Sequence, residues 1–278
     1  MRRTAAGLLL ATLAALATLW GCAPRALLPA PLAERREAGP LAAALERYNS
    51  GPQAVRAWGT LKGDGPGRAD FGATVVPGTG LRFDAGAGPF SVPLFALACR
   101  SGIECQGYWP SRARVYVDEG GRWERFLAAA LRGRVPLLVQ PVSATGWQSD
   151  QGAPVLVLEG EDGWQQRVEF SAAGDRPERV LVGRAGKTPA AAVRYEEYGP
   201  DLEGQPFPGR LRLNLAEPER EMEITFVRVE AAPNVDTSLF ALSVPPGTAE
   251  ERVRGTATWN EKAVPFWPSP PKGRGAPR

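Results

Sequence analysis

The sequence contains no histidine. This absence excludes Ser-His-Asp and Cys-His catalysis, His-ligated zinc and the commonest general base near neutral pH. Carboxylate pairs such as Asp118-Glu119 and Glu196-Glu197 lie in turns or beside basic residues, a setting typical of solvated charge rather than of a glycosidase pair. The glycine-rich turn 63–67 contains no lysine, which a phosphate-binding loop needs. We therefore expect a protein that is not an enzyme and that has no metal or cofactor.

Long apolar runs are equally scarce, and the longest lies at the start of the chain. Arg2 and Arg3 precede an apolar stretch over residues 5–19, and Pro24 follows shortly after it. This order is typical of a secretory signal. The stretch is shorter than the roughly 20 residues of a permanent transmembrane helix. We therefore expect an exported protein.

The end of this stretch resembles the lipobox of bacterial lipoproteins. Leu19, Gly21 and Cys22 occupy the −3, −1 and +1 positions, although Trp20 is bulkier than the usual residue at −2. We predict a lipoprotein signal peptide over residues 1–21 and an acyl anchor, such as palmitate, on Cys22. The alternative is an ordinary signal peptide that is cut elsewhere.

The mature chain has no excess of either charge. Removal of residues 1–21 takes away Arg2 and Arg3 and leaves 31 basic against 30 acidic side chains. Phosphate backbones are bound by clustered lysine and arginine, so we expect no nucleic-acid partner.

Cysteine is rare, with three residues in the chain. If Cys22 carries lipid, Cys99 and Cys105 remain as a pair in a compartment that permits oxidation. Residues 100–104 between them are turn-like, so we predict a disulfide between Cys99 and Cys105. Two free thiols are the alternative.

The composition divides the chain into four parts. After the signal peptide, residues 22–39 hold the acylated cysteine and a proline-spaced, extended tether. Residues 40–247 form one domain, which opens with a short helix over 40–48. Residues 248–278 lose all periodicity and are rich in proline, which predicts a disordered tail.

Strands dominate the domain, because apolar residues alternate with polar ones between glycine- and proline-rich turns. In Arg210–Leu215 every second residue is apolar, and after Phe226 the apolar positions slip by one residue, which predicts a bulge. The predicted strands are 55–62, 69–76, 81–84, 90–98, 113–118, 155–159, 165–170, 179–183, 191–198, 210–215 and 222–230.

One amphipathic helix interrupts the strands. Trp123, Phe126 and Leu127 share a face with residues 130 and 131, and Gly133 ends the helix. Several aromatic residues, among them Trp109, Trp147, Trp164 and Phe207, stand beside glycine or proline rather than in mid-strand. These rings either pack a sheet against helices or leave an apolar cavity under the amphipathic helix.

Several segments resemble the lipoprotein-carrier superfamily, the LolA/LolB-like proteins. Residues 55–61 resemble the family's opening strand, and residues 108–117 with the helix 123–131 and Gly-x-x-Pro at 133–136 resemble its middle. Residues 195–198, 207–208 and 211–215 resemble its paired late strands. Asn234 to Gly247 resembles its closing Asn…Leu-Phe-x-Leu-x-x-Pro-x-Gly pattern. The likeness covers about residues 41–247.

The resemblance implies a mainly β fold with short helices, an incomplete antiparallel barrel of about eleven strands wrapped on a helical plug. It also implies an apolar cavity for the acyl chains of a lipid or lipoprotein. The candidate cavity-lining residues are Trp58, Phe71, Phe83, Phe90, Phe95, Trp123, Phe126, Leu127, Leu213, Ile224 and Phe226.

We therefore expect an outer-membrane lipoprotein on the periplasmic face that binds lipid and participates in envelope or lipoprotein assembly. Ala23 after the acylated cysteine is consistent with outer-membrane sorting by the enterobacterial rule. The alternative is an accessory lipoprotein of an envelope protein machine, with no lipid cargo and with its function in contacts to a protein partner. A cavity closed by Phe95 or Trp123 favours that alternative.

Overall fold

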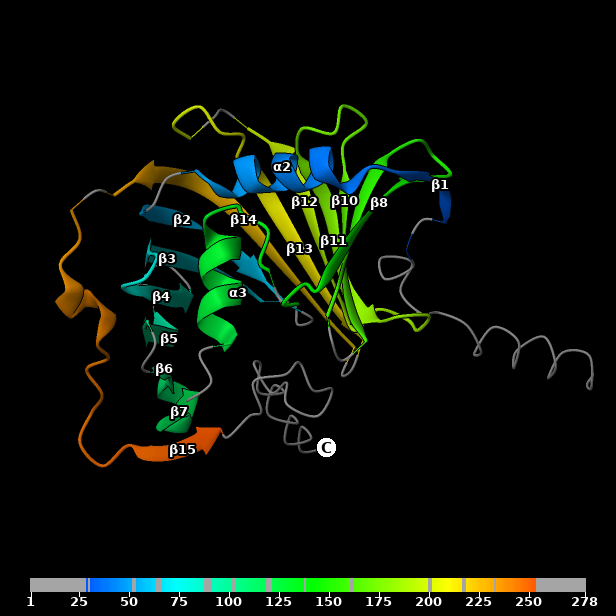
Figure 1. The fold of residues 1–278 in the computed structure, drawn as a ribbon. Coiled ribbons are helices and arrows are strands. Elements are labelled where there is room, and N and C mark those ends of the chain that lie inside the picture. The colour runs from blue at the N-terminus through cyan, green and yellow to red at the C-terminus, as the bar shows by residue number, and fades with distance from the viewer. Residues whose placement is uncertain are drawn as a thin grey trace, which may run out of the picture.

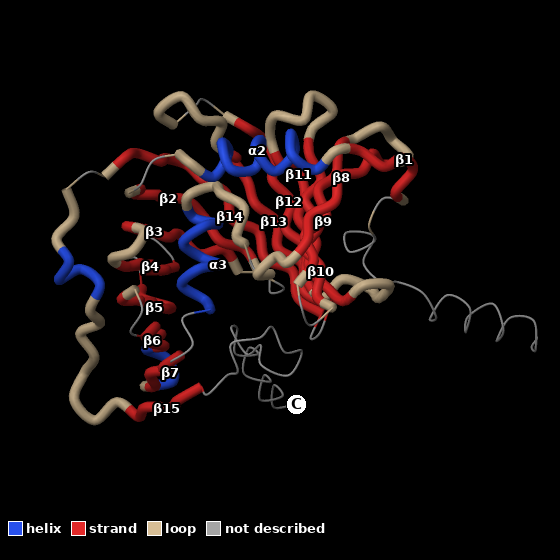
Figure 2. The backbone as a smooth tube through the Cα atoms, viewed as in Figure 1, coloured by secondary structure: helices blue, strands red, loops and turns tan. Residues whose placement is uncertain are grey.

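The computed structural model describes residues 29, 31–51, 54–63, 67–87, 92–101, 104–118, 122–137, 139–160, 163–199, 202–216, 219–232 and 234–253. Most of them form strands of one open, strongly curved sheet, with two helices on its concave side (Figures 1 and 2). The predicted signal peptide and Cys22 lie outside the described residues. Within the described ranges, no helix is long and apolar enough to cross a bilayer.

The sheet contains fifteen strands in the part of the chain that the structure describes. The helices are α2 (Ala38–Asn49) and α3 (Arg122–Leu131), and the short 3₁₀ turns are η2 (Pro110–Arg112) and η3 (Thr237–Phe240). The strands are β1 (Leu32–Arg36), β2 (Val55–Lys62), β3 (Arg68–Val76), β4 (Gly80–Ala87), β5 (Val92–Arg100), β6 (Glu104–Trp109), β7 (Arg114–Asp118), β8 (Ser143–Ser149), β9 (Pro154–Glu159), β10 (Trp164–Phe170), β11 (Pro177–Arg184), β12 (Ala191–Tyr198), β13 (Pro208–Ala216), β14 (Glu219–Ala231) and β15 (Ala249–Val253).

Two antiparallel meanders make up the sheet. The first runs from β2 to β7, and the second runs from β8 to β14. The chain crosses from one to the other through α3, and β14 then returns to pair with β2. Because of this pairing, the two meanders form one continuous surface, and α2 and α3 lie within its curve (Figure 1).

The sequence predicts about eleven strands, and the structure contains four that are not among them. Two of them, β6 and β8, lie inside the meanders. The other two are the edges: β1 belongs to the segment predicted as a tether and pairs with β8, and β15 begins the predicted disordered tail and pairs in parallel with β7. The chain reaches β15 through η3, whose Phe240 is buried against Gly80 of β4.

Alternation along the strands gives the sheet an apolar inner face and a polar outer face. In β2, Ala57 and Leu61 face inward and are buried, whereas Trp58 is 37% exposed on the outer face. The guanidinium of Arg228 lies 5.2 Å from the centre of the Trp58 ring. The prediction that Trp58 lines an inner cavity is therefore wrong, because its neighbours on either side already face inward.

The junction between the meanders is a close approach of two backbones. A Cβ on Gly59 of β2 would lie 2.0 Å from the carbonyl oxygen of Thr225 and 2.9 Å from Cε1 of Phe71. The β14–β2 register shifts between Phe226 and Arg228, which is the bulge that the sequence predicts.

Cys99 and Cys105 form a disulfide in the structure. They are direct register partners on the neighbouring strands β5 and β6, with Cα atoms 4.0 Å apart. Both residues are buried, so the bridge belongs to the inner face of the first meander.

Replacing Gly59 by alanine tests the junction. We expect Gly59→Ala to lower the free energy of unfolding by about 1–3 kcal/mol, because the added methyl group overpacks against backbone. Gly72→Ala on β3 is the matched control, since its Cβ would lie 3.5 Å from the nearest described atom, on Trp58. Urea unfolding followed by circular dichroism measures both, and equal stability of the two variants would contradict this view of the junction.

Candidate functional site

A row of aromatic side chains crosses the inner face of the first meander. Phe71 of β3 stacks on Phe83 of β4 with ring centres 5.2 Å apart, and Phe83 lies 6.2 Å from Phe95 of β5. Each of these three side chains is at most 5% exposed. Ala85 is the register partner of both Phe71 and Phe95, so small and large residues alternate across the strands.

The row continues beyond these three rings in both directions. Phe95 lies 4.2 Å from the ring of Trp109, which meets Tyr116 edge to face at 5.0 Å. At the other end, Phe226 of β14 meets Phe71 edge to face at 6.1 Å and Phe207 at 5.0 Å. Such edge-to-face contacts add to the stabilisation from burial. The row therefore extends from β14 to β7 without leaving the inner face.

Glycines give the rings their space. Gly59 faces Phe71 across β2 and β3, and a Cβ on Gly107 of β6 would lie 2.9 Å from Cζ3 of Trp109 and 3.2 Å from Cε2 of Phe95. A side chain at either position would displace a ring.

Helix α3 covers part of this face. Leu127, Ala130 and Leu131 are buried in the same apolar core as Phe71 and Phe83. Gly133, with φ +64°, ends the helix, because its N–H donates to Ala130 and the next N–H, of Arg134, donates to Ala129.

Side chains from α2 hold the segment after α3. The Tyr48 hydroxyl donates to the Gly133 carbonyl at 2.6 Å. Asn49 donates to the Val135 carbonyl at 3.2 Å and accepts from the Val135 N–H at 3.0 Å.

The second meander supplies two further bonds to the same segment. The Tyr195 hydroxyl of β12 donates to the Arg134 carbonyl at 3.1 Å, and the Gln166 amide of β10 donates to the Pro136 carbonyl at 2.8 Å. Four consecutive backbone carbonyls are thus bonded by side chains from three elements, which fixes the position of α3 over the aromatic row. We call residues 133–136 the anchor segment.

The Arg134 side chain is 2% exposed, and its guanidinium lies 5.2 Å from the centre of the Tyr48 ring. A Cβ on Gly51 would lie 1.6 Å from its Nη2, so Gly51 leaves room for the guanidinium. Burial lowers the pKa of Arg134, and Tyr48 and Tyr198 oppose that shift.

Burial has the opposite effect on the pKa of the tyrosines. It raises the pKa of Tyr48 to about 12, while the hydrogen bond with Tyr198 and the charges of Arg134 and Arg176 lower it. Burial also raises the pKa of Tyr195 and of Tyr198. The Tyr48 hydroxyl lies 3.3 Å from that of Tyr198, which in turn donates to the Pro177 carbonyl.

The structure brings together most of the predicted cavity residues that it describes. Trp58 lies on the outer face, as reported above; Phe90 lies outside the described residues, as do the side chains of Trp123 and Phe126. The predicted residues in the inner core or packed against it are Phe71, Phe83, Phe95, Leu127, Leu213, Ile224 and Phe226.

The prediction did not place Trp109, Tyr116 and Phe207 in this row. Trp109 and Phe207 each stand next to proline, which marks them as unusual but does not say which face they take. Tyr48 and Tyr195 carry no local signal for a bond to the anchor segment, because their partners lie 85 and 61 residues away in sequence.

Comparison with solved structures identifies the architecture. A crystal structure of a LolA superfamily protein from Nitrosomonas europaea matches with a TM-score of 0.53 at 10% identity, over 74% of this chain and 98% of that one. The chain has a LolA-like fold. The match confirms the open sheet around helices that the sequence resemblance implies.

Two further crystal structures are similar at lower scores. A putative outer membrane lipoprotein-sorting protein domain from Vibrio parahaemolyticus has a TM-score of 0.46 at 9% identity, and a DUF1329 family protein from Desulfovibrio piger has 0.49 at 10%. Each match covers 72% of this chain and 94% of the other. No protein-family model and no curated protein matches the sequence.

Removing the Tyr48 hydroxyl tests the anchor segment. We expect Tyr48→Phe to lower the free energy of unfolding by about 1–3 kcal/mol, because the buried Gly133 carbonyl loses its donor. Tyr108→Phe on β6, remote from the anchor segment, is the control. Thermal unfolding of both variants gives the comparison, and an equal loss in the two would argue against a specific role for Tyr48.

The raised tyrosine pKa values predict a loss of stability in alkali. Above pH 10 the unfolded chain ionises its tyrosines while Tyr48 remains neutral until about pH 12, so the unfolded state binds fewer protons. The free energy of unfolding should fall as pH rises through this window. The free energy of unfolding of Tyr48→Phe should fall less steeply over the same window. A free energy of unfolding that does not change between pH 10 and 12 would contradict the burial of these hydroxyls.

Proposed function

We propose that the chain is an envelope lipoprotein that binds the acyl chains of a lipid or lipoprotein between α3 and the aromatic row of β3–β6. In this proposal Cys22 carries the lipid anchor and holds the domain on the periplasmic face of the outer membrane. The protein acts by binding and not by catalysis. It contributes to envelope or lipoprotein assembly.

One observation carries the proposal: the inner face of the first meander is an apolar surface covered by one short amphipathic helix. Phe71 of β3 and Phe83 of β4, the strands that α3 contacts, share one apolar core with Leu127 and Leu131 of α3. Moving an acyl chain out of water gains about 0.8 kcal/mol per CH₂, so a dozen carbons gain on the order of 10 kcal/mol before ordering costs. Such binding needs apolar area and no reactive group.

The likeness in fold supports the same proposal. The similar protein from Nitrosomonas europaea belongs to the LolA superfamily, and the similar domain from Vibrio parahaemolyticus is described as a putative outer membrane lipoprotein-sorting protein. The sequence also predicts the secretory signal that an envelope location requires.

The burial of the rings favours a second candidate. Phe83 and Phe95 are 5% and 3% exposed and pack on each other, on Phe71 and on Trp109. Acyl chains therefore enter only if α3 or the rings move. If they do not move, the chain is an accessory lipoprotein that acts through contacts with an envelope protein.

A fluorescent fatty acid titrated into the full chain carrying Cys22→Ser distinguishes the two candidates. We expect saturable binding that Ala85→Trp weakens about tenfold, because the indole fills the space between Phe71 and Phe95. Ala96→Trp is the matched control, since Ala96 lies on the outer face of the neighbouring strand β5. Its affinity should equal that of the unsubstituted chain.

Two results would count against lipid binding. Absence of binding up to the solubility of the fatty acid would remove the first candidate, and equal weakening by both tryptophans would place the ligand elsewhere. The second candidate would then be tested by crosslinking with and without residues 254–278. The deletion stops after β15, because β15 pairs with β7 and its loss would damage the sheet.

A further inference from the structure

The outer face of the second meander carries a cross-strand row of charges. Glu169 of β10, Arg179 of β11, Arg194 of β12, Arg212 of β13 and Glu223 of β14 are successive register partners. Three arginines are thus direct neighbours in the sheet. Like charges opposite each other destabilise a sheet, so this row needs compensating anions.

Together with Arg167 and Arg210 beside it, this row forms a cluster in which glutamates compensate four of the five arginines. Arg179 pairs with Glu169 at 3.6 Å, and Arg212 pairs with Glu223 at 3.0 Å. The remaining ion pairs of the cluster are Arg167–Glu169 at 3.1 Å, Arg210–Glu196 at 3.1 Å, Arg212–Glu196 at 3.3 Å and Arg210–Glu197. Four arginines therefore share four glutamates, and Arg194 is left over.

Arg194 forms no ion pair with the residues that the structure describes. Its Nε is buried without a hydrogen-bond partner, whereas the side chain as a whole is partly exposed. Its charge adds to those of Arg179 and Arg212 on either side. Burial lowers the pKa of Arg179, Glu169 raises it, and the nearby charge of Arg194 lowers it further. A buried guanidinium N–H without an acceptor is unfavourable, because it loses water and gains no hydrogen bond.

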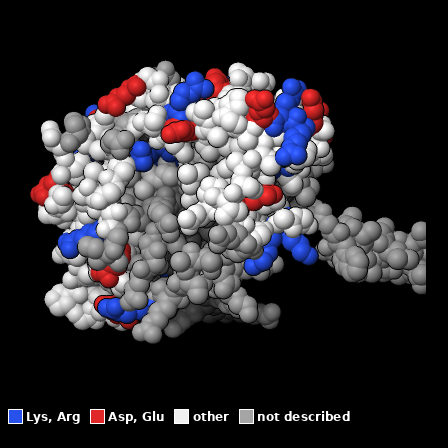
Figure 3. Space-filling model, in the orientation of Figure 1, with Lys and Arg blue, Asp and Glu red and all other residues white. Residues whose placement is uncertain are grey.

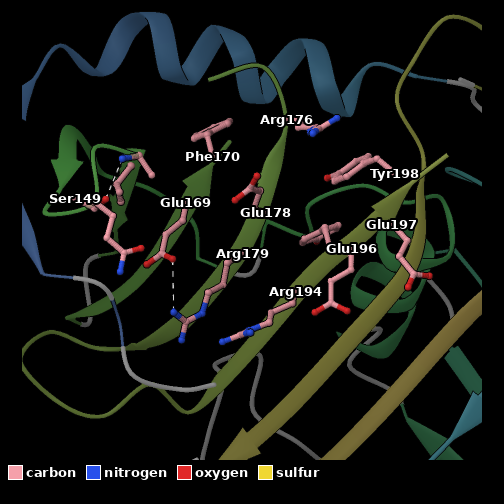
Figure 4. A pocket seen from close by; sticks show the side chains of 14 residues that line it. Ser149, Glu169, Phe170, Arg176, Glu178, Arg179, Arg194, Glu196, Glu197 and Tyr198 are labelled. Atoms are coloured by element: carbon pink, nitrogen blue, oxygen red, sulfur yellow. Dashed lines mark hydrogen bonds and ion pairs between the residues drawn. The ribbon is translucent and has the colours of Figure 1, made fainter. Parts of the chain in front are cut away.

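Arg194 lies in a groove of about 530 Å³. The turn between β8 and β9 forms one wall, and the ends of β10, β11 and β12 form the others. Figure 4 shows Arg179 and Arg194 side by side, with Glu169 and Glu196 on the same side of the sheet. On the face of the molecule in Figure 3, by contrast, basic and acidic side chains are interspersed over the described surface.

The backbone around the groove is irregular on both sides. The β10–β11 register shifts between Glu169 and Phe170, which leaves Glu178 without a register partner and exposed. In β12, Glu197 has φ +55°, a conformation that is unfavourable for a residue with a side chain. Bulges and strained residues of this kind concentrate where side chains are aimed at ligands.

We infer that Arg194, together with Arg179, binds an oxyanion of the phosphate type in this groove. A planar guanidinium donates two parallel hydrogen bonds to such a group, and a second arginine beside it holds the remaining oxygens. The ligand supplies the acceptor that Arg194 lacks among the described residues. The inference is independent of acyl-chain binding, which concerns the opposite face of the sheet.

Glu178 provides a second test, in which the affinity for the anion should change in the opposite direction. It lines the groove, is exposed, and has no ion pair among the described residues. Its negative charge opposes an anion, so its removal should strengthen binding, whereas removal of Arg194 should weaken it.

Calorimetric titration of inorganic phosphate into the full chain carrying Cys22→Ser, at low ionic strength, tests the site. Arg194→Gln should weaken binding about tenfold or more, because it removes charged hydrogen bonds. Glu178→Gln should strengthen it about two- to threefold. Arg228→Gln removes the same charge from the outer face at Trp58 and should change the affinity less than about twofold.

Thermal unfolding separates binding from folding. Without phosphate, Arg194→Gln should unfold at or above the temperature of the unsubstituted chain, because it relieves repulsion by Arg179 and Arg212. Phosphate should raise the unfolding temperature of the unsubstituted chain and not that of this variant. A strongly lowered unfolding temperature of Arg194→Gln without phosphate would assign Arg194 a structural role and overturn the inference.

Vesicles distinguish a free phosphate from a lipid headgroup. If the chain binds phosphatidylcholine vesicles only when they contain phosphatidic acid, and this binding depends on Arg194, the ligand is a lipid headgroup. If inorganic phosphate binds and the vesicles show no such preference, the ligand is a free phosphate. Both results support the site. Equal losses in Arg194→Gln and Arg228→Gln, or no binding in either format, would overturn it.

Discussion

The pairing of β14 with β2 is the contact on which the rest of the structure depends. It joins the last strand of one meander to the first strand of the other, and Gly59 permits the approach because it has no side chain to meet the Thr225 carbonyl. The bulge beside Phe226 lets this ring contact Phe71 and Phe207. Without this junction, the aromatic row would end at β3 and the sheet would separate into two curved pieces.

The helices depend on the same arrangement. Once the two meanders are joined, α2 lies close enough to β10 and β12 for Tyr48, Asn49, Tyr195 and Gln166 to bond the anchor segment together. These bonds satisfy backbone groups that would otherwise be buried without partners. They hold the C-terminal end of α3 over the aromatic row, so the cover of the inner face is positioned by residues from both halves of the sheet.

The two faces of the sheet have different chemistry because strand side chains alternate. The inner face collects rings and small residues, which suit hydrocarbon. The outer face of β10–β14 collects arginines and glutamates, most of which form ion pairs, whereas Arg194 has none among the described residues. One sheet thus offers an apolar surface and an ionic groove on opposite sides, and substitutions can alter either one separately.

Local sequence patterns determined much of the fold. The alternation of apolar and polar residues predicted a strand over residues 55–62, which is β2 in the structure. The one-residue slip after Phe226 predicted the bulge. This alternation is absent from Ser143–Ser149 and weak in Glu104–Trp109, and the edge strands β1 and β15 are largely charged. These four segments are strands because they pair with neighbouring strands, and their own sequences do not predict it. Only the tertiary structure decided that Trp58 faces outward, that Phe207 meets Phe226 and that Arg194 is left without a glutamate. The physical reason is that the alternation of apolar and polar residues determines which residues of one strand share a face. The register between strands distant in sequence determines which side chains contact one another on that face.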